Sequence, residues 1–144
     1  MHKVILKSGR EKSLLRRHPW VFSGAIARVE GSPGAGDTVR VIAQDGRFLA
    51  LAAYNPQSQI SARVWDWHET TRIDAAFFLE RIAAAMQMRK VLLDTEAGGA
   101  MRLIHGESDG LPGLIVDRYA DVVVMQVSSA GCDRWRDAIT AALD

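Results

Sequence analysis

The chain has 144 residues, of which 48% are hydrophobic and 24% are charged, with a formal net charge of +1. These values are typical of a globular protein with one domain or two small ones, and they exclude an intrinsically disordered chain. No stretch approaches the ~18 consecutive apolar residues of a membrane helix, and the N-terminus lacks a signal-peptide cleavage site. The single cysteine, Cys132, excludes an internal disulfide framework and suits a reducing cytoplasm.

The small net charge conceals an uneven distribution along the chain. Residues 1–68 contain ten Lys and Arg side chains against five Asp and Glu, a balance of +5. Residues 69–144 contain eight against twelve, a balance of −4. This segregation predicts two parts with different roles, and the basic part is a candidate surface for a polyanion, because Lys and Arg displace condensed counterions from phosphates.

The first elements in chain order are short. Residues 4–6 are predicted to form an apolar strand, which Gly9 ends. Residues 10–17 suit a short helix, because Pro19 disfavours helical backbone at the residue before it. The aromatic and β-branched run at 20–22 favours a strand.

The following elements are also predicted to be strands. Residues 31–37 have the composition of a loop, and Val39 and Val41 then alternate with Arg40 as in a half-buried strand. Asp45-Gly46 is a two-residue hairpin signal that leads into a strand at 47–51. A further alternating strand is predicted at 60–65. The first ~67 residues therefore read as a small, mostly β unit with one short helix.

The pattern changes near residue 70 to a long helix. Asp74 is placed to cap its start, and Gly98-Gly99 to end it. Two apolar stripes at helical spacing are expected to face the core. One consists of Leu79, Ile82, Met86 and Leu93, and the other of Phe78, Ala85 and Leu92.

Three strands and a last helix complete the predicted elements. A strand at 101–104 is followed by turns through residue 113, and then by strands at 114–116 and 122–125. The last of these is almost entirely apolar, which predicts a central strand. Trp135, Ile139 and Leu143 recur at helical spacing in a final helix that has no terminal cap at Asp144, so the chain is expected to be truncated there.

No complete catalytic constellation is present in the sequence. The four histidines have no metal-ligand spacing, and the glycines of 31–36 precede a strand rather than opening a helix, so they do not predict a phosphate cradle. Cys132 has no CxxC partner and is interpreted as inert. Residues 105–109, His-Gly-Glu-Ser-Asp, admit two interpretations, a hydrogen-bonded turn or a cation site, and the turn is favoured. We therefore predict no catalytic, cofactor-binding or metal-binding residue.

One short span concentrates positive charge. GREKSLLRRHPWVFSGAI, residues 9–26, contains four cations, and Glu11 alone balances them. At helical pitch the four cations divide between two faces, so they cannot all contact one phosphate track. A solvated surface is one interpretation of the span, and nucleic-acid contact is the other. Trp20 is interpreted as a core residue in preference to a platform on which a base stacks.

These residues resemble a known family. The span 9–26 is similar to the start of the PUA domain in bacterial S-adenosylmethionine-dependent methyltransferases that modify cytosine carbon 5 in large-subunit (23S) ribosomal RNA. RLIHGESDGLPGLIVDRYADVVVMQ, residues 102–126, resembles a second signature of that family. The resemblance covers essentially the whole chain. It implies an α+β fold with a PUA pseudobarrel at residues 1–70 and a small β/α linking module at 71–144, without the Rossmann-like catalytic domain that follows in the family.

The resemblance also implies what the chain does. The parent protein would be a cytoplasmic methyltransferase that uses S-adenosylmethionine, and this segment would be the part that binds ribosomal RNA. Because the first helix and neighbouring strands of PUA domains generally face RNA, the resemblance assigns RNA contact to a set of residues in and around the basic span. They are Lys7, Arg10, Lys12, Arg16, Arg17, His18, Trp20 and Gly24. Two alternatives remain, a stand-alone RNA-binding adaptor and a module whose apolar strands pair with a second copy as a homodimer.

Overall fold

The computed structural model describes residues 1–92 and 100–144, which form two compact units, Met1–Thr71 and Arg72–Asp144. Each unit combines a β-sheet with helical segments, so the predicted α+β class is confirmed. The predicted helix end at Gly98-Gly99 and the stripe residue Leu93 lie outside the described residues.

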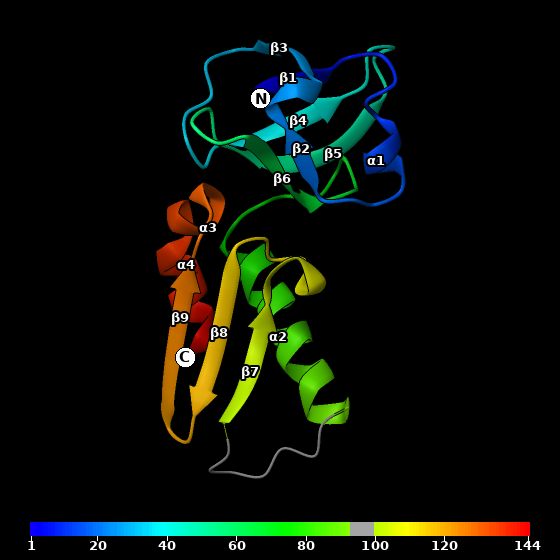
Figure 1. The fold of residues 1–144 in the computed structure, drawn as a ribbon. Helices are drawn as coiled ribbons and strands as arrows, with labels where there is room; N and C mark the ends of the chain where they lie inside the picture. Colours follow the sequence, from blue (N-terminus) through cyan, green and yellow to red (C-terminus); the bar gives the residue numbers. More distant parts are fainter. Residues whose placement is uncertain (93–99) are drawn as a thin grey trace. The chain divides into compact units, whose positions relative to one another are not determined.

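The first unit is a curled six-stranded sheet with one short helix (Figure 1). Its strands follow the order β2-β6-β5-β4-β1-β3, and all neighbouring pairs are antiparallel except β1 with β4. The predicted strands of this part are confirmed. The elements are β1 (Lys3–Leu6), α1 (Lys12–Leu15), β2 (Trp20–Phe22), the 3-10 helix η1 (Ser23–Ala25), β3 (Ile26–Glu30), β4 (Thr38–Ile42), β5 (Phe48–Tyr54) and β6 (Ile60–Asp66).

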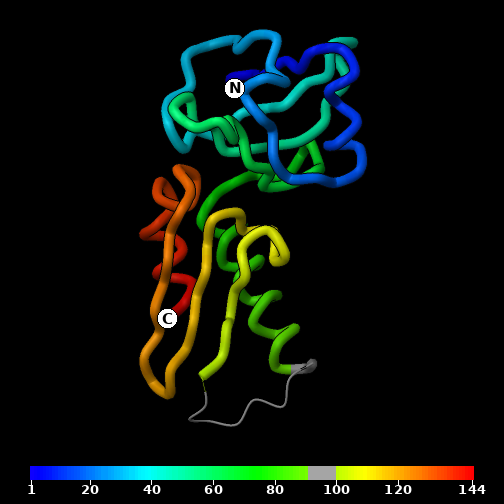
Figure 2. The backbone as a smooth tube through the Cα atoms, viewed as in Figure 1, coloured from blue at the N-terminus to red at the C-terminus, as the bar shows by residue number. Residues whose placement is uncertain are grey.

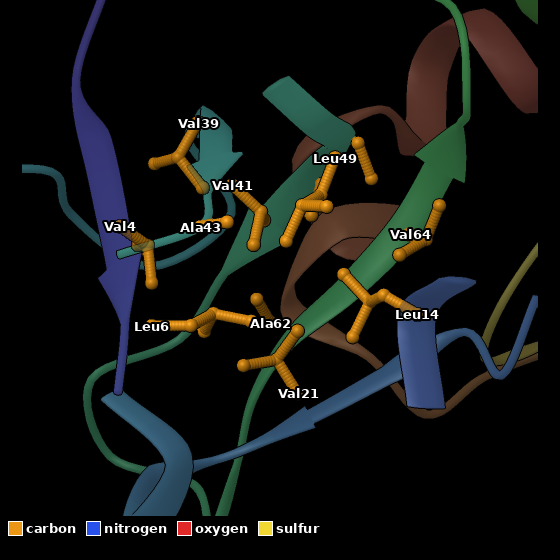
Figure 3. Close-up of a cluster of buried hydrophobic side chains, with 12 residues drawn as sticks. Val4, Leu6, Leu14, Val21, Val39, Val41, Ala43, Leu49, Ala62 and Val64 are labelled. Carbon is orange, nitrogen blue, oxygen red and sulfur yellow. The ribbon is translucent and has the colours of Figure 1, made fainter. Parts of the chain in front are cut away.

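Side chains from α1 and from five of the strands meet in the core of this unit (Figure 3). Leu14 is the one buried residue of α1 and joins a cluster of apolar side chains that the curled sheet surrounds. Burying one such side chain contributes roughly 1.5–3 kcal/mol, so Leu14 anchors the basic helix to the sheet. The cluster contains Val4, Leu6, Leu14, Val21, Val39, Val41, Ala43, Leu49, Ala50, Ala52, Ala62 and Val64.

Two local predictions for this unit are wrong. The helix expected over residues 10–17 spans Lys12–Leu15 only, and Arg17 has left-handed backbone with φ 67°. The helix ends earlier because left-handed backbone at Arg17 lets Arg17 N donate to Leu14 O and His18 N donate to Ser13 O, which closes the last turn. The hairpin at Asp45-Gly46 is longer than two residues, because Ala43 N donates to Arg47 O and encloses a three-residue loop. Gly46 takes φ 93° there, as in a type I turn with a bulge.

The second unit is a three-stranded antiparallel sheet of order β7-β8-β9 with helices on one side (Figures 1 and 2). The long helix α2 packs against α4 and β7. As predicted, Asp74 caps α2, because its Oδ1 accepts a hydrogen bond from Phe77 N at 3.0 Å. The elements are α2 (Ala75–Leu92), β7 (Ala100–His105), the 3-10 helix η2 (Gly106–Asp109), β8 (Leu114–Tyr119), β9 (Val122–Val127), α3 (Ala130–Arg134) and α4 (Arg136–Leu143).

The packing of α2 corrects the predicted apolar stripe. Phe78, Ile82 and Ala85 are buried, and the Phe78 ring lies 5.2 Å from the Trp135 ring. Leu79 is 55% exposed, so its assignment to the core is wrong. Phe77 is buried instead, so the buried face of α2 includes position 77 and not position 79.

Strand β9 departs most from the prediction. It was expected to be central because it is apolar, but it is an edge strand that pairs with β8 alone. Val122, Val123 and Val124 are 56%, 46% and 43% exposed. An apolar strand is buried only if it has a neighbouring strand on each edge and a covering layer on each face of the sheet. Among the described residues, β9 has a neighbouring strand on one edge only.

The helices of both units are too short or too polar to cross a bilayer, as far as the described residues extend.

Candidate nucleic-acid interface

The predicted cations lie on α1 and on the two turns that flank it. Lys7, Arg10, Lys12, Arg16 and Arg17 are all exposed. Before the helix, Gly9 takes φ 84°, and Arg10 N donates to Lys7 O at 3.0 Å to close the turn. The turn carries exposed cations on both sides of Gly9, so the positive charge extends beyond the four-residue helix.

The turn after α1 is held by backbone hydrogen bonds. Arg17 N donates to Leu14 O at 2.9 Å, and His18 N donates to Ser13 O at 2.9 Å. Pro19 O then accepts from Val64 N at 2.8 Å, which ties the chain to β6. Left-handed backbone at a residue such as Arg17 costs about 1 kcal/mol and is enriched at functional sites. The turn therefore fixes the direction in which Arg16 and Arg17 leave the helix.

The cations of this span differ from three other arginines of the unit in having no acidic partner among the described residues. Arg28 pairs with Glu30, Arg40 with Glu69, and Arg47 with Asp45. Within residues 1–92 and 100–144, no carboxylate pairs with any of the five cations Lys7, Arg10, Lys12, Arg16 and Arg17. Their charge is uncompensated and faces solvent, which is the condition for attracting phosphates.

Trp20 lies at the edge of the core and is half-buried. It is absent from the buried cluster, so the interpretation of Trp20 as a core residue is not supported. Its ring meets the His18 ring edge-to-face at 5.8 Å and the Phe22 ring at 6.2 Å. Its indole Nε1 is buried and has no hydrogen-bond partner among the described residues. Trp20 thus connects the exposed turn to the strand.

Two further residues belong to this surface that the sequence did not indicate. Arg63 is the direct neighbour of Trp20 across β2 and β6, and its Cζ lies 5.4 Å from the centre of the Trp20 ring. Arg17 Cζ lies 4.8 Å from the Trp67 ring centre. Each pair places a cation over an aromatic face, an arrangement worth ~0.5–1 kcal/mol when exposed. The Trp20–Arg63 pair follows from strand register, because the two residues are far apart in the sequence.

A shallow hollow separates α1 from β2. Its volume is about 80 Å³, and Arg10, Ser13, Trp20 and Phe22 are among the residues that line it. Small-molecule pockets usually measure ~300–1,000 Å³, so this hollow is smaller than the pockets that typically hold a small molecule. Gly24 lies nearby in η1, and a Cβ added there would meet no protein atom within 4 Å.

The segment 105–109 is a structural turn in this fold. Asp109 accepts hydrogen bonds from Arg89 at 2.9 and 2.8 Å and from His105 N at 2.6 Å, which uses both of its oxygens. His105 Nδ1 lies 3.2 Å from Arg102, a guanidinium that repels cations. In the part of the chain that the structure describes, no three His, Cys, Asp or Glu residues are grouped to hold a metal ion. These contacts favour the turn interpretation.

Two other polar contacts in the second unit are structural. Arg102 donates to Asp117 at 2.8 and 3.2 Å, and these hydrogen bonds lower the pKa of the Asp117 carboxyl. The buried Cys132 donates through Sγ to Pro112 O at 3.1 Å, consistent with an inert thiol.

Neither glycine-rich turn has the geometry of a nucleotide-cofactor site. Such a site needs a strand, a glycine turn and a helix whose N-terminus receives the ligand. Residues 31–37 connect β3 to β4, and residues 110–113 lead into β8, so each joins strands. The described residues therefore do not fit S-adenosylmethionine, and no step of a reaction is assigned to them.

Comparisons with known proteins agree with this geometry. Residues 4–67, which contain every predicted RNA-contact residue, match the PUA-like domain family. Over 141 residues the chain is 51% identical to ribosomal RNA large subunit methyltransferase I of Erwinia tasmaniensis, and 49% and 48% identical to the proteins of that name in Enterobacter sp. and Yersinia pseudotuberculosis. Each match covers 98% of this chain and 36% of the relative, so the chain spans about a third of the relatives' length.

Solved structures show the same fold. A protein from Streptococcus mutans, provisionally assigned as a SAM-dependent methyltransferase, superposes with a TM-score of 0.82 at 21% identity over 99% of this chain and 37% of that protein. A second, provisionally named a methyltransferase and complexed with SAH, gives a TM-score of 0.83 at 21% identity over the same shares. The predicted similarity to the N-terminal part of ribosomal RNA large subunit methyltransferases is confirmed by the identity to these relatives, and the solved structures show the same fold.

Proposed function

We propose that this chain is the RNA-binding N-terminal portion of an S-adenosylmethionine-dependent methyltransferase that modifies cytosine carbon 5 in large-subunit ribosomal RNA. The binding surface consists of Lys7, Arg10, Lys12, Arg16, Arg17, His18, Trp20 and Gly24, together with Arg63. The PUA-like match of residues 4–67 and the names of the relatives support this proposal. A protein with this proposed function would act in the cytoplasm, where ribosomes are assembled.

The uncompensated cation surface is the observation that carries the proposal. A solvated, structurally neutral face would be expected to balance its charges, as Arg28, Arg40 and Arg47 are balanced. Instead, the five exposed cations flank a half-buried tryptophan, with a guanidinium over its ring. RNA-binding surfaces commonly combine cations that contact phosphates with an aromatic side chain that stacks on a base.

The test is a titration of a structured fragment of large-subunit ribosomal RNA at several salt concentrations. Each phosphate contact contributes a slope of roughly −0.7 to −0.9 to the dependence of log K on log salt. A contact from every one of the five cations would set an upper limit near −4 for the slope, and affinity would be highest at low salt. A folded chain that shows no binding at low salt would remove RNA recognition from this segment.

The methyl-transfer part of the proposal predicts a division of labour within a longer protein. We expect residues 1–144 to bind no S-adenosylmethionine in calorimetry, because no strand–glycine turn–helix is present among the described residues. Micromolar binding would mean that the turn at 105–113 holds the cofactor in a way that its contacts do not indicate. Sequencing of the gene beyond the codon for Asp144 distinguishes the recruiting portion of an enzyme from a stand-alone adaptor.

A further inference from the structure

A second hollow of the first unit lies between the turn that precedes α1 and the loop that joins β4 to β5. Both walls are held by the fold, because Leu14 anchors α1 in the core and Ala43 N donates to Arg47 O at 2.9 Å to close the loop. The volume of this hollow is about 160 Å³. It is lined by Ser8, Glu11, Ala43, Gln44, Asp45 and Arg47.

Glu11 has none of the usual structural roles of an acidic residue at the start of a helix. It directly precedes α1, yet its side chain accepts no hydrogen bond from the first turn. Among the described residues it forms no ion pair, not even with its neighbours Arg10 and Lys12. Its Oε2 is buried and has no hydrogen-bond partner in the described part of the chain. A buried carboxylate oxygen without a partner is unfavourable, so it indicates a donor that a ligand supplies.

The other acidic residue of the hollow already has its partner. Asp45 accepts from Arg47 Nε at 3.1 Å through Oδ1 and at 2.8 Å through Oδ2. The Gln44 side chain is exposed on the same loop and forms no hydrogen bond within the described residues. The hollow therefore offers a ligand the Glu11 carboxylate, which can only accept hydrogen bonds, and the Gln44 amide, which can also donate.

The charge around Glu11 indicates what kind of ligand this is. Glu11 is the only acidic residue from Lys7 to Arg17, a stretch that contains five cations. A carboxylate in such a stretch repels phosphates, so it weakens binding to the RNA backbone. It can instead accept hydrogen bonds from the N–H groups of a base whose phosphates contact the flanking cations.

We propose that this hollow receives the Watson–Crick edge of one unpaired guanine, with the Glu11 carboxylate accepting from N1–H and N2–H and the Gln44 amide donating to O6. The inference rests on the proposed RNA binding and adds a base preference to it. Among the four RNA bases, guanine presents two adjacent donors, which match the two oxygens of a carboxylate. Adenine and cytosine present one amino group beside a ring-nitrogen acceptor, and uracil presents one N–H between two carbonyls.

The size of the hollow agrees with this ligand. Pockets that enclose a whole small molecule measure ~300–1,000 Å³, so a hollow of about 160 Å³ suits the edge of a base that remains attached to its strand.

A divalent cation is the other ligand that a carboxylate attracts, and the hollow is poorly built for it. Ca²⁺ takes ~6–8 oxygen ligands, whereas Glu11 supplies the one carboxylate that is not already paired. No three His, Cys, Asp or Glu side chains are grouped for a metal ion within the described ranges. The experiment is therefore run in EDTA, with Mg²⁺ added in a separate arm.

The test compares three single-stranded RNA probes on the 144-residue chain at low salt. The first is an oligouridine with one central guanosine, the second has inosine at that position, and the third has uridine throughout. Inosine lacks only the N2 amino group of guanosine. We expect the guanosine strand to bind about tenfold more tightly than the uridine strand, with the inosine strand between them.

Glu11→Gln is the decisive variant, because the two roles of the carboxylate predict opposite changes. We expect it to weaken binding of the guanosine strand about tenfold, while binding of the uridine strand stays equal or increases slightly. Gln44→Ala should also reduce the preference for guanosine. Glu30→Gln is the matched control, since it removes the same charge from an exposed residue of β3 that does not line the hollow. It should leave the preference unchanged.

The melting temperature of Glu11→Gln should equal or exceed that of the parent, because no partner of the carboxylate is lost. A lower melting temperature, equal binding of the three strands to the parent, or a preference that appears only with Mg²⁺ would each overturn the inference. So would a Glu11→Gln variant that binds all strands more tightly in an unchanged ratio. If a structured ribosomal RNA fragment binds the parent while the strands show no preference, the proposed function stands and this inference fails. If that fragment does not bind, both fail.

Discussion

Trp20 and Arg63 are direct cross-strand neighbours on β2 and β6, and the guanidinium of Arg63 lies over the indole ring of Trp20 at 5.4 Å. The pair orders the tryptophan without burying it completely. An aromatic ring held in this way loses little conformational freedom when a nucleobase approaches its exposed edge. The stability and RNA-binding roles of Trp20 can therefore be separated by substitution.

We expect Trp20→Ala to affect both properties moderately. Loss of a fully buried aromatic costs ~3–5 kcal/mol, and because Trp20 is half-buried we expect about 1–2 kcal/mol. RNA affinity should fall by about 1–3 kcal/mol if the ring contacts a base. Urea denaturation and RNA titration measure the two effects. Trp20→Phe is the control, since it retains an aromatic ring, and it should preserve most of the affinity. Unchanged RNA affinity in a folded Trp20→Ala variant would exclude a base contact.

Simultaneous replacement of Arg16 and Arg17 by Ala should weaken RNA binding and reduce the salt slope by about 2, one for each lost phosphate contact. Stability should change by at most ~1 kcal/mol, because both side chains are exposed and only the Arg17 contact with Trp67 is lost. The salt dependence of RNA affinity is the measurement.

Replacement of both Arg28 and Arg47 by Ala is the matched control for charge. These arginines are exposed and already paired with Glu30 and Asp45. The control removes the same number of positive charges as the Arg16 and Arg17 variant, but it should leave most of the RNA affinity intact. Equal losses in the two double variants would show that RNA responds to net charge alone, which would contradict a defined interface on α1.

Local sequence patterns predicted the strands and the helix cap because they depend on neighbouring residues. Asp74 accepts from Phe77 N because a carboxylate three residues before a free N–H can reach it in any helix start. The concentration of cations around α1 was likewise visible from composition. The sequence could not show which cations are paired. Arg28, Arg40 and Arg47 have acidic partners, whereas the cations in and around α1 have none among the described residues.

The features that the sequence missed depend on tertiary pairing. Arg63 joins the candidate site only through the register of β2 with β6, which places it opposite Trp20. Strand β9 reads as central by composition, yet its place in a sheet depends on whether a second neighbour is available. Arg17 takes left-handed backbone at the end of α1, a conformation that charge patterns do not predict.

Gly24→Ala provides a test of close backbone approach by RNA. A methyl group at this position meets no protein atom within 4 Å, and its φ lies outside the left-handed region. We therefore expect the variant to be as stable as the parent or slightly more stable, because alanine restricts the unfolded chain. RNA affinity should fall if the nucleic acid contacts this backbone. Ser23→Ala, a change in the adjacent residue of η1, is the control, and equal affinity in all three proteins would remove Gly24 from the interface.

The ion pair between Arg89 and Asp109 should contribute strongly to the stability of the second unit. The side chains are 17% and 5% exposed, and two hydrogen bonds join them. Asp109→Ala leaves the guanidinium and the backbone N–H of His105 without their acceptor. Removal of one partner from a buried pair costs ~3–5 kcal/mol, and we expect a loss near the lower limit because Arg89 is not completely buried.

Urea denaturation followed by the fluorescence of Trp135, whose ring packs on Phe78, would measure this loss in a background without the other tryptophans. Asp133→Ala is the control, since its pair with Arg136 has side chains 67% and 49% exposed and should contribute under ~1 kcal/mol. The alternative of a cation site at 105–109 predicts that millimolar Ca²⁺ or Mg²⁺ stabilises the parent and not Asp109→Ala. We expect no such stabilisation, because Arg89 occupies both oxygens of the carboxylate.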